Sequence, residues 1–533
     1  MNGSVRAATP RATAKRPGLA RCRGLARYLG LVLLSVLAAP TLVVGQSVER
    51  TRLEAAQEWR VSSEITSPEM LATRIDRILE DPALARAHVG LTVQVAETGE
   101  ILYERNGEKR FTPASNAKLV TGAVGLTVLG PDYRWKTRLV ADGPIEHGTL
   151  EGNLWIVGGG DPALERDELR AWIKHLLKAG IRRIRGDVIG DDRVFTQPIW
   201  GEGWMWDDLY AGWSAGVSGL QLSPNTVSAA VVPGADLGDD TELVLRAEGP
   251  ALPIRNRVLT GAPGSEIRLQ FVPPAEGGDV ELRGWVPLGP DSVRLYLAAP
   301  HPTLYLLDWM RRLLARADIK VEGSFRRAMA DEWAEEEFWS HSTLSNPFSR
   351  LLGEMLKPSD NQMAETILRT IGFEEGNAGS PAEGIDVVES TLADWGIESG
   401  AINLVDGSGL SRYNEVTPNG IARMLRAVWR HPDFKTFYYG LPVAGVDGTM
   451  SRRLLATPAF DNVHAKTGSM SSVRALSGYL VDGSGETLLF SLLLNGYDSS
   501  DSVAVALEDL LVEQISLYRR PIEPGWPELR AAP

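Results

Sequence analysis

The pattern of predicted elements changes twice along the chain, near residues 136 and 340, and this change limits the possible folds most strongly. Residues 68–129 predict a helix, a two-stranded hairpin and a second helix, from their apolar periods and the turn residues between them. From 136 to 340, glycine, proline and short strand patterns are more frequent, and helices prevail again after this stretch. We therefore expect one discontinuous domain of mixed α and β structure (α/β, or α+β), interrupted by inserted, mostly β material.

Individual elements are predicted from apolar periods, capping residues and turn signals. The residues after 340 predict several helices, one long hairpin around the turn Asp482–Gly485 and a closing amphipathic helix. In chain order, the predicted elements are a helix from Pro68 to Leu79, strands at His88–Val95 and Ile101–Glu104, helices at 115–129, 302–317, 347–356, 362–371, 381–396 and 418–431, strands at Ser472–Val481 and Glu486–Asn495, and a helix at 502–518.

The first 45 residues predict an export signal. Residues 1–27 contain seven basic residues and no acidic residue, and an apolar run from Tyr28 to Val44 follows. Pro40 and Gly45 interrupt the run where a signal peptide should end, which favours cleavage. The alternative is an uncleaved anchor helix, because the run approaches the minimum length that spans a bilayer. Either form places the protein outside the cytoplasm, and we expect a periplasmic location.

Charge and cysteine content exclude several classes of function. The chain has a net charge of −13, and without the seven basic residues of the predicted signal this becomes −20. A body this acidic repels phosphate backbones, so nucleic acid is not an expected partner. The single cysteine, Cys22, lies inside the signal, so the exported chain has no disulfide and no thiolate nucleophile. The seven histidines show no H-x-H or H-x-x-x-H grouping, and no metal site is expected.

Three short motifs carry the chemistry, and the first is Ser-Asn-Ala-Lys at the start of a predicted helix. Ser115 and Lys118 are three residues apart, so on a helix they share a face and the lysine amine can reach the serine oxygen. A serine hydroxyl needs a base to become a nucleophile, and lysine can be that base when burial or a nearby cation lowers its pKa. Taken alone, the tetrad is more simply a helix-capping serine followed by a solvated lysine.

The second motif, Ser359-Asp360-Asn361, lies between two predicted helices. The hydroxyl of Ser359 could relay a proton between two amines, and the amide of Asn361 could both donate to a peptide and accept from it. Alone, this tripeptide is more simply the N-cap of the helix predicted to begin at Gln362.

The third motif, Lys466-Thr467-Gly468-Ser469, is expected at the end of a strand that begins at Asn462. A lysine facing a cleft would attract a substrate carboxylate, and the hydroxyls of Thr467 and Ser469 could bond to it. Gly468 would let another backbone approach closely. Alone, the motif is more simply a strand ending in a turn.

In this order, the three motifs resemble the active-site set of penicillin-binding proteins and serine β-lactamases. Ser359 follows Ser115 by 244 residues, far more than one hairpin-linked helical subdomain needs. This spacing resembles the class C low-molecular-mass penicillin-binding proteins, the D-alanyl-D-alanine carboxypeptidase/endopeptidase (DacB-like) family. Residues 158–164, 406–412 and 445–449 look like that family too. At Ser214–Gly216 the sequence departs from the family pattern, and this departure concerns the local loop and not the chemistry.

The resemblance implies a division of the chain into domains. A penicillin-binding-protein/β-lactamase-like transpeptidase domain would be formed by residues 46–135 and 341–522. The inserted region, 136–340, would form two small domains. The signal peptide would occupy residues 1–45, and a tail residues 523–533.

The resemblance also implies a mechanism on peptidoglycan stem peptides and their cross-links. Ser115 would attack the carbonyl between two D-alanines, with neutral Lys118 taking its proton. Ser359 would pass the proton to the leaving amine, Lys466 would keep the local field positive and Asn361 would bond to the substrate amide. Penicillin and other β-lactams would acylate the same serine, and no cofactor would be needed. The expected strand contacts to the substrate come from Thr467, Gly468 and Ser469, with the oxyanion between the N–H groups of Ser115 and Ser469.

By the same resemblance, Asp208, Trp213 and Arg412 reach the substrate cleft. Asp208 could hold the ammonium and Arg412 the carboxylate of one amino-acid head, with Trp213 lining the pocket. The side chain of meso-diaminopimelate ends in such a head, whereas lysine carries only an amine. A plain salt bridge between Asp208 and Arg412, or two separate surface charges, is the alternative.

Other interpretations compete. A serine β-lactamase would share all three motifs, and a catalytically silent peptidoglycan-binding protein would share the fold. Whether the protein forms a homo-oligomer stays open. Gly212–Gly216 fits the nucleophile elbow of α/β-hydrolases but lacks the strand and helix that the elbow needs. Residues 158–163 fit a loose dinucleotide fingerprint. A carboxylate at Asp161 would then face the negatively charged pyrophosphate, and no second such unit follows, which argues against this interpretation. His464 could serve as a triad base, although a packed or exposed strand histidine is the simpler interpretation.

Overall fold

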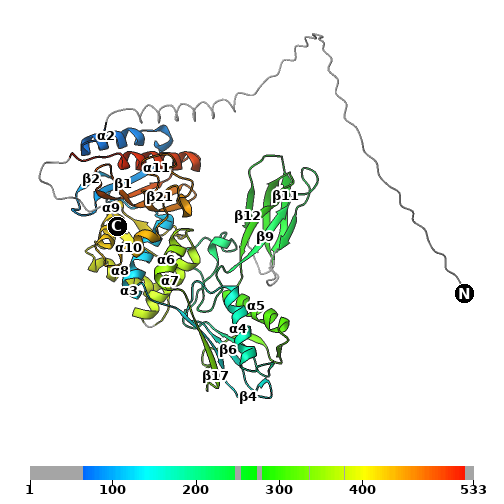
Figure 1. Ribbon diagram of the computed structural model, residues 1–533. Helices are drawn as coiled ribbons and strands as arrows, with labels where there is room; N and C mark the ends of the chain where they lie inside the picture. The colour runs from blue at the N-terminus through cyan, green and yellow to red at the C-terminus, as the bar shows by residue number, and fades with distance from the viewer. Residues whose placement is uncertain (1–63, 246–253, 273–278, 335, 377, 522–533) are drawn as a thin grey trace, which may run out of the picture. The chain divides into compact units, whose positions relative to one another are not determined.

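The computed structural model describes residues 64–245, 254–272, 279–334, 336–376 and 378–521 (Figure 1). The predicted export signal, Cys22 and the tail 523–533 lie outside these ranges. Within the described ranges, no helix combines the length and the apolar character needed to cross a membrane.

The catalytic part is built on a five-stranded antiparallel sheet with the order β2-β1-β22-β21-β20. Strands β1 and β22 are buried along almost their whole length, which explains their continuous apolar sequence. The N-terminal hairpin pairs directly with the C-terminal one, so residues on both sides of the insertion form one sheet. The strands are β1 (His88–Val95), β2 (Ile101–Arg105), β20 (His464–Met470), β21 (Val473–Val481) and β22 (Thr487–Asn495).

Helices cover both faces of this sheet (Figure 1). On one face lie α2 (Pro68–Leu79) and α11 (Asp501–Ser516), which contact each other. On the other face, helix α3 (Ala117–Leu129) is buried over its first ten residues, because its alanine, glycine, valine and leucine side chains are apolar on every side. Helix α3 and the helices around it share one hydrophobic core. The surrounding helices are α6 (Phe348–Leu356), α7 (Asn361–Glu375), α8 (Pro381–Asp394), α9 (Pro418–Trp429) and α10 (Phe434–Gly440).

The inserted residues form two groups of small sheets. The first group has the strand orders β16-β8-β6-β3-β17 and β15-β7-β5-β4. Helices α4 (Arg166–Lys178) and α5 (Pro302–Arg316) pack against it, and its apolar core continues into the second group. The strands of the first group are β3 (Lys136–Ala141), β4 (Ile145–Glu146), β5 (Thr149–Leu150), β6 (Leu154–Val157), β7 (Arg183–Ile184), β8 (Val188–Asp191), β15 (Lys320–Val321), β16 (Phe325–Arg327) and β17 (Trp339–Leu344).

The second group consists of two three-stranded sheets with the orders β10-β9-β14 and β11-β13-β12. Since β17 pairs with β3, the inserted sheet structure extends to Leu344, slightly past the expected boundary at 340. The division into domains stays a prediction. The strands of this group are β9 (Thr226–Val232), β10 (Glu242–Leu245), β11 (Ile254–Gly261), β12 (Arg268–Val272), β13 (Val280–Pro287) and β14 (Val293–Ala298).

The predicted class, mixed α and β with a large β-rich insertion, is confirmed. Strand β20 (His464–Met470) carries the Lys-Thr-Gly-Ser motif at its end, as expected, and begins two residues later than the expected Asn462. Helix α7 begins at Asn361, one residue earlier than expected, with Asp360 as its N-cap. Helix α10 was not predicted, because its aromatic-rich sequence has no helical signal of its own and only packing selects it.

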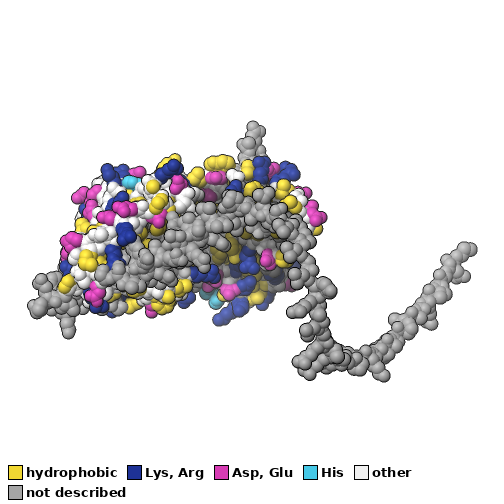
Figure 2. Space-filling view, turned by 90° about the horizontal axis from the view of Figure 1, so that it is seen from above, with side chains coloured by type: hydrophobic (Ala, Val, Ile, Leu, Met, Phe, Trp, Pro, Cys, Tyr) yellow, Lys and Arg dark blue, Asp and Glu magenta, His cyan; other side chains and the backbone are white. Residues whose placement is uncertain are grey.

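Acidic and basic side chains are interspersed on the face of the molecule that Figure 2 shows. Many ion pairs of the described residues are exposed to solvent, such as that of Arg110 with Glu415 at 3.0 Å. The negative excess of the chain is therefore not gathered into one patch on that face. Exposed pairs of this kind contribute little to stability.

Candidate active site

Ser115 lies in a short 3-10 turn, η2 (Ala114–Asn116), directly before the buried helix α3. Ala114 has a left-handed backbone (φ 46°), so the chain turns sharply into the helix at this position. The Nζ atom of Lys118, one turn further on, lies 3.0 Å from Oγ of Ser115. The structure therefore brings these two predicted residues together by the expected spacing along a helix.

The amine of Lys118 has three oxygen neighbours and no exposed surface. Besides Ser115, it contacts Oδ1 of Asn361 at 2.6 Å and the main-chain oxygen of Ser408 at 2.5 Å. Asn361 is the first residue of α7, and its Nδ2 donates to the main-chain oxygen of Trp213 at 2.7 Å. The first and second motifs thus meet at one amine.

Burial lowers the pKa of Lys118 to about 8 from the ordinary lysine value of 10.5. The carboxylates of Asp406, Asp360 and Glu365 oppose this effect, because each favours the charged amine. Lys466 is also fully buried, and its pKa lies well below the usual value, first through burial and then through repulsion by Lys118. Burial rather than the neighbouring cation is therefore the main cause of the low lysine pKa values.

The oxygen of Ser408 belongs to a tight turn that is organised by the buried side chain of Asp406. This carboxylate accepts hydrogen bonds from the main-chain nitrogens of Gly409 and Ser411, both at 2.8 Å, and from Trp204 Nε1 of the insertion at 2.8 Å. Sequence reasoning identified this segment only through its likeness to a family. The contact to Lys118 carries no sequence signal, because it joins residues 290 positions apart.

Strand β20 carries the third motif along the edge of the central sheet. Nζ of Lys466 donates to the main-chain oxygen of Thr467 at 2.8 Å, and the Thr467 hydroxyl donates to that of Thr449 at 2.7 Å. A Cβ at Gly468 would lie 2.6 Å from the oxygen of Pro113, so glycine lets β20 lie against the segment that precedes the serine. Ser469, the last residue of the motif, is exposed.

Ser359 lies between α6 and α7 in a left-handed conformation (φ 66°). Asp360, which follows it, caps α7 by accepting from the nitrogen of Met363 at 2.8 Å. Among the residues that the structure describes, no hydrogen bond joins the Ser359 hydroxyl to either motif lysine. The proton relay through Ser359 stays a prediction.

Asp208, Trp213 and Arg412 come from the insertion and from the turn after Asp406. Burial and the charge of Asp207 raise the pKa of Asp208, while the Trp213 side chain and the charge of Arg412 oppose this rise. Arg412 donates to the main-chain oxygen of Ser471 at 3.1 Å, and Trp213 is 58% exposed. No ion pair within 4.0 Å joins Asp208 to Arg412 in the described part of the chain, so a direct salt bridge is not their arrangement.

The competing patterns have structural roles. Ser214 is fully buried in a 3-10 turn, where its hydroxyl donates to the main-chain oxygens of Asp208 and Ala211, and no strand-turn-helix elbow is present at this serine. Asp161 is buried and accepts from the nitrogen of Ala163 at 2.9 Å. His464 stacks on Tyr438 with ring centroids 3.9 Å apart, as expected of a packed strand histidine.

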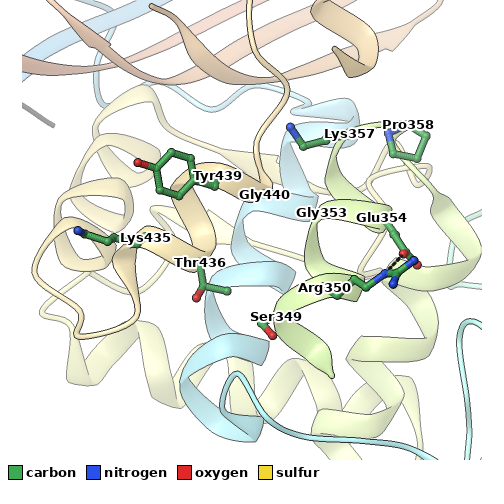
Figure 3. Close-up of a pocket in the computed structure, with 10 residues that line it drawn as sticks. All are labelled: Ser349, Arg350, Gly353, Glu354, Lys357, Pro358, Lys435, Thr436, Tyr439 and Gly440. Atoms are coloured by element: carbon green, nitrogen blue, oxygen red, sulfur yellow. Dashed lines mark hydrogen bonds and ion pairs between the residues drawn. The ribbon is translucent and has the colours of Figure 1, made fainter. Parts of the chain in front are cut away.

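A groove of about 850 Å³ lies between α6 and α10 (Figure 3). Gly353 and Gly440 let the two helices cross closely at its floor, where a Cβ on Gly353 would lie 3.7 Å from the Cα of Gly440. None of the motif residues lines this groove, although Lys357 and Pro358 of its lining directly precede the second motif. The groove is lined by Ser349, Arg350, Gly353, Glu354, Lys357, Pro358, Lys435, Thr436, Tyr439 and Gly440.

A serine held against a buried lysine of lowered pKa, next to an Asn amide and a Lys-Thr-Gly edge strand, is the arrangement of a penicillin-recognising serine acyl-transferase. Comparison with known proteins narrows this class. Residues 71–514 match the D-Ala-D-Ala carboxypeptidase 3 (S13) family. A D-alanyl-D-alanine carboxypeptidase of Actinomadura sp. (strain R39) is 33% identical over 458 residues, which cover 83% of this chain and 84% of the relative.

The solved structure of penicillin binding protein 4 (dacB) from Haemophilus influenzae is similar with a TM-score of 0.75 and 28% identity. This match covers 83% of this chain and 99% of that one. A second structure of the Haemophilus protein, complexed with a β-lactam, has a TM-score of 0.71 and 26% identity, covering 84% of this chain and 99% of that one. This chain belongs to the D-Ala-D-Ala carboxypeptidase 3 (S13) family. It is a serine-type, penicillin-binding DD-peptidase, as its motifs predict.

Proposed function

We propose that Ser115 is the nucleophile of this carboxypeptidase and that Lys118 is its base. The contacts of the amine carry this assignment. A neutral amine has two hydrogens and one lone pair, and the oxygens of Asn361 and Ser408 can accept both hydrogens. The lone pair is then left for the hydroxyl proton of Ser115, 3.0 Å away. This arrangement supports removal of that proton as the oxygen attacks the peptide carbonyl.

We infer that the substrate lies along the outer edge of β20. This strand is the last of its sheet, and beyond the isolated bridge between Val443 and His464 its outer edge is available for pairing. In this pose Thr467 and Ser469 meet the terminal carboxylate, and the oxyanion lies between the N–H groups of Ser115 and Ser469.

The remaining motif residues act on the leaving group and the substrate amide. Ser359 passes a proton to the departing D-alanine, and Lys466 keeps the local field positive. Asn361 bonds to the substrate amide: its side-chain nitrogen leaves the main-chain oxygen of Trp213 and donates to a substrate oxygen instead. Water then releases the acyl-enzyme, which gives carboxypeptidase action on a free stem peptide and endopeptidase action on a cross-link.

We further propose that Asp208 and Arg412 select the diaminopimelate type of stem peptide. The charge of Arg412 acts on the pKa of Asp208, and no ion pair joins the two side chains in the described residues, so both remain available to the two charges of a zwitterionic head. The ammonium would bind Asp208 and the carboxylate Arg412, while Trp213 covers the head. The exposed position of Arg412 and the half-buried position of Asp208 support access from solvent.

The wider setting follows from the same proposal. The protein acts on peptidoglycan outside the cytoplasm after export, and β-lactams acylate Ser115, as complex formation with a β-lactam by the similar Haemophilus protein suggests. The chain divides into the discontinuous catalytic domain, expected at 46–135 and 341–522, and the inserted region, expected at 136–340, whose sheet continues to Leu344.

Labelling with a fluorescent penicillin tests the assignment of the nucleophile. The unmodified protein should carry the label through denaturing electrophoresis, and Ser115→Ala should carry none. Labelling of Ser115→Ala would refute the assignment. Release of hydrolysed penicillin within seconds would instead favour a β-lactamase, for whose fast deacylation the sequence offers no dedicated base.

A further inference from the structure

The side chain of Glu365 lies in helix α7, one turn after Asn361, and is fully buried. Its Oε1 accepts hydrogen bonds from the main-chain nitrogens of Gly407, at 2.8 Å, and Ser408, at 2.9 Å. In the part of the chain that the structure describes, Oε2 has no hydrogen-bond partner. A buried carboxylate with one unsatisfied oxygen is an unfavourable arrangement, so the position of Glu365 in the fold calls for a structural explanation.

The turn that Glu365 holds is the one that presents an oxygen to Lys118. Glu365 binds the N–H groups of Gly407 and Ser408, and Asp406 binds the next one, that of Gly409, at 2.8 Å. Two carboxylates therefore fix three consecutive N–H groups. The Ser408 oxygen lies between the second and third of these groups along the chain, and it accepts from Lys118 at 2.5 Å.

The other contacts of the turn do not replace the hydrogen bonds that Glu365 accepts from Gly407 and Ser408. The hydroxyl of Thr121 donates to the oxygen of Gly407 at 2.7 Å, so it holds the opposite side of the same peptide unit. A Cβ on Gly407 would lie 2.9 Å from the oxygen of Ala364, so the turn lies directly against α7, next to Glu365. Without the carboxylate, two N–H groups of a buried turn would lose their acceptor.

The charged groups around Glu365 come from three elements. Burial and the neighbouring Asp406 raise the pKa of Glu365 to about 7, while the guanidinium of Arg369, one turn further along α7, opposes this rise. The negative charge of Glu365 in turn raises the pKa of Lys118, together with Asp406 and Asp360. Glu365 therefore acts on the amine of Lys118 in two ways, through the turn that it holds and through its charge.

We propose that Glu365 is a positioning residue for the catalytic lysine. By holding the Gly407–Ser408 turn, it keeps the Ser408 oxygen on one hydrogen of the Lys118 amine and so aims the lone pair of the amine at Ser115. This inference rests on the proposed role of Lys118 as the base.

The test compares two substitutions by the rate constant of β-lactam acylation between pH 5.5 and 10. Glu365→Ala removes the acceptor of both N–H groups, and acylation should fall at least about tenfold at every pH. Glu365→Gln keeps an oxygen for the turn but removes the charge. Its plateau rate should stay within about threefold of the unmodified protein, while the acid limb moves to lower pH by up to about one unit.

Glu508→Ala and Glu508→Gln are the matched controls. Glu508 is also a buried carboxylate whose pKa burial raises to about 7, and it is paired with Arg453 at 3.0 Å, away from the motifs. Both controls should lower the melting temperature and leave the pH profile of acylation unchanged. Folding of each variant is checked by circular dichroism, and Glu365→Gln keeps the test decisive if Glu365→Ala does not fold.

Two results would overturn the inference. One is a Glu365→Gln plateau rate that falls by more than about threefold although the turn keeps its oxygen acceptor; the other is a Glu365→Ala rate that falls no further than the Glu508→Ala rate. Lys118→Arg, measured beside them, separates this inference from the proposed function. If Lys118→Arg is acylated normally, the role of the lysine as base fails. If only the Glu365 variants behave normally, the positioning role alone fails.

Discussion

Nδ2 of Asn361 donates a 2.7 Å hydrogen bond to the main-chain oxygen of Trp213, so a residue of the second motif is held by the inserted region. The oxygen of the same amide accepts from Lys118 at 2.6 Å. A carbonyl on one side and an amine on the other leave only one favourable orientation for the amide. The insertion therefore helps to orient a side chain that contacts the lysine.

Substitution of Asn361 by Asp should slow acylation at neutral pH. The new carboxylate would lie beside the Lys118 amine, favour its charged form and raise its pKa, while repelling the oxygen of Trp213. We expect the acylation rate at pH 7 to fall at least about tenfold, with recovery as the pH rises towards 10. Stopped-flow measurements with a chromogenic cephalosporin would show this. An unchanged pH profile would contradict the close contact between this amide and the amine.

The unmodified protein should acylate faster as the pH rises to about 8. Lys118 acts as a base only when neutral, and burial lowers its pKa to about 8, so the neutral fraction grows with pH up to that value and then levels off. Below it, the rate should change about tenfold per pH unit. A rate that is flat between pH 6 and pH 8 would show that the reactive lysine is already neutral at pH 6.

Replacement of Lys118 by Arg should reduce acylation by about 10²–10⁴-fold while the protein stays folded. A guanidinium keeps a positive charge and hydrogen-bond donors but does not lose a proton near neutral pH. Penicillin labelling measures the reaction, and circular dichroism the fold. Normal labelling of Lys118→Arg would remove the lysine from the role of base.

Gly409→Ala should abolish acylation, whereas Gly396→Ala should not affect it. Both glycines have a left-handed backbone, with φ of 81° and 72°. A Cβ on Gly409 would lie 1.9 Å from the oxygen of Ala114, next to Ser115, whereas nothing lies within 4 Å of a Cβ on Gly396. Gly396→Ala should therefore lose only about 1–2 kcal/mol of stability from backbone strain. Equal acylation by the two variants would refute the close approach at Ala114.

Diaminopimelate-type stem peptides should be cleaved tens- to thousands-fold faster than lysine-type peptides, because two charge-assisted hydrogen bonds of roughly 1.5–3 kcal/mol each are partly offset by desolvation. Arg412→Ala should narrow this difference while penicillin still labels Ser115. Mass spectrometry of the muropeptide products measures both rates. Equal rates on the two peptides with the unmodified protein would refute the pocket between Asp208 and Arg412.

The predictions that succeeded concern short stretches of chain. The hairpin of β1 and β2 follows from residue alternation and the turn between the strands, and the contact of Ser115 with Lys118 follows from the helical spacing alone. The sequence missed an element where local signals are weak. Helix α10 (Phe434–Gly440) has an aromatic-rich sequence without a helical signal of its own, and its packing against α6 selects the helix.

The sequence by itself determined which reactive groups are present, their order, and the pairing of Ser115 with Lys118 on one helical turn. The tertiary structure decided how the lysine is held and how its proton affinity is lowered. Asn361 and Ser408 reach that amine from 243 and 290 residues away, and the burial that lowers its pKa comes from helices and turns on both sides of the insertion. Local periodicity cannot encode such contacts, because they depend on how distant elements pack and how much water they exclude.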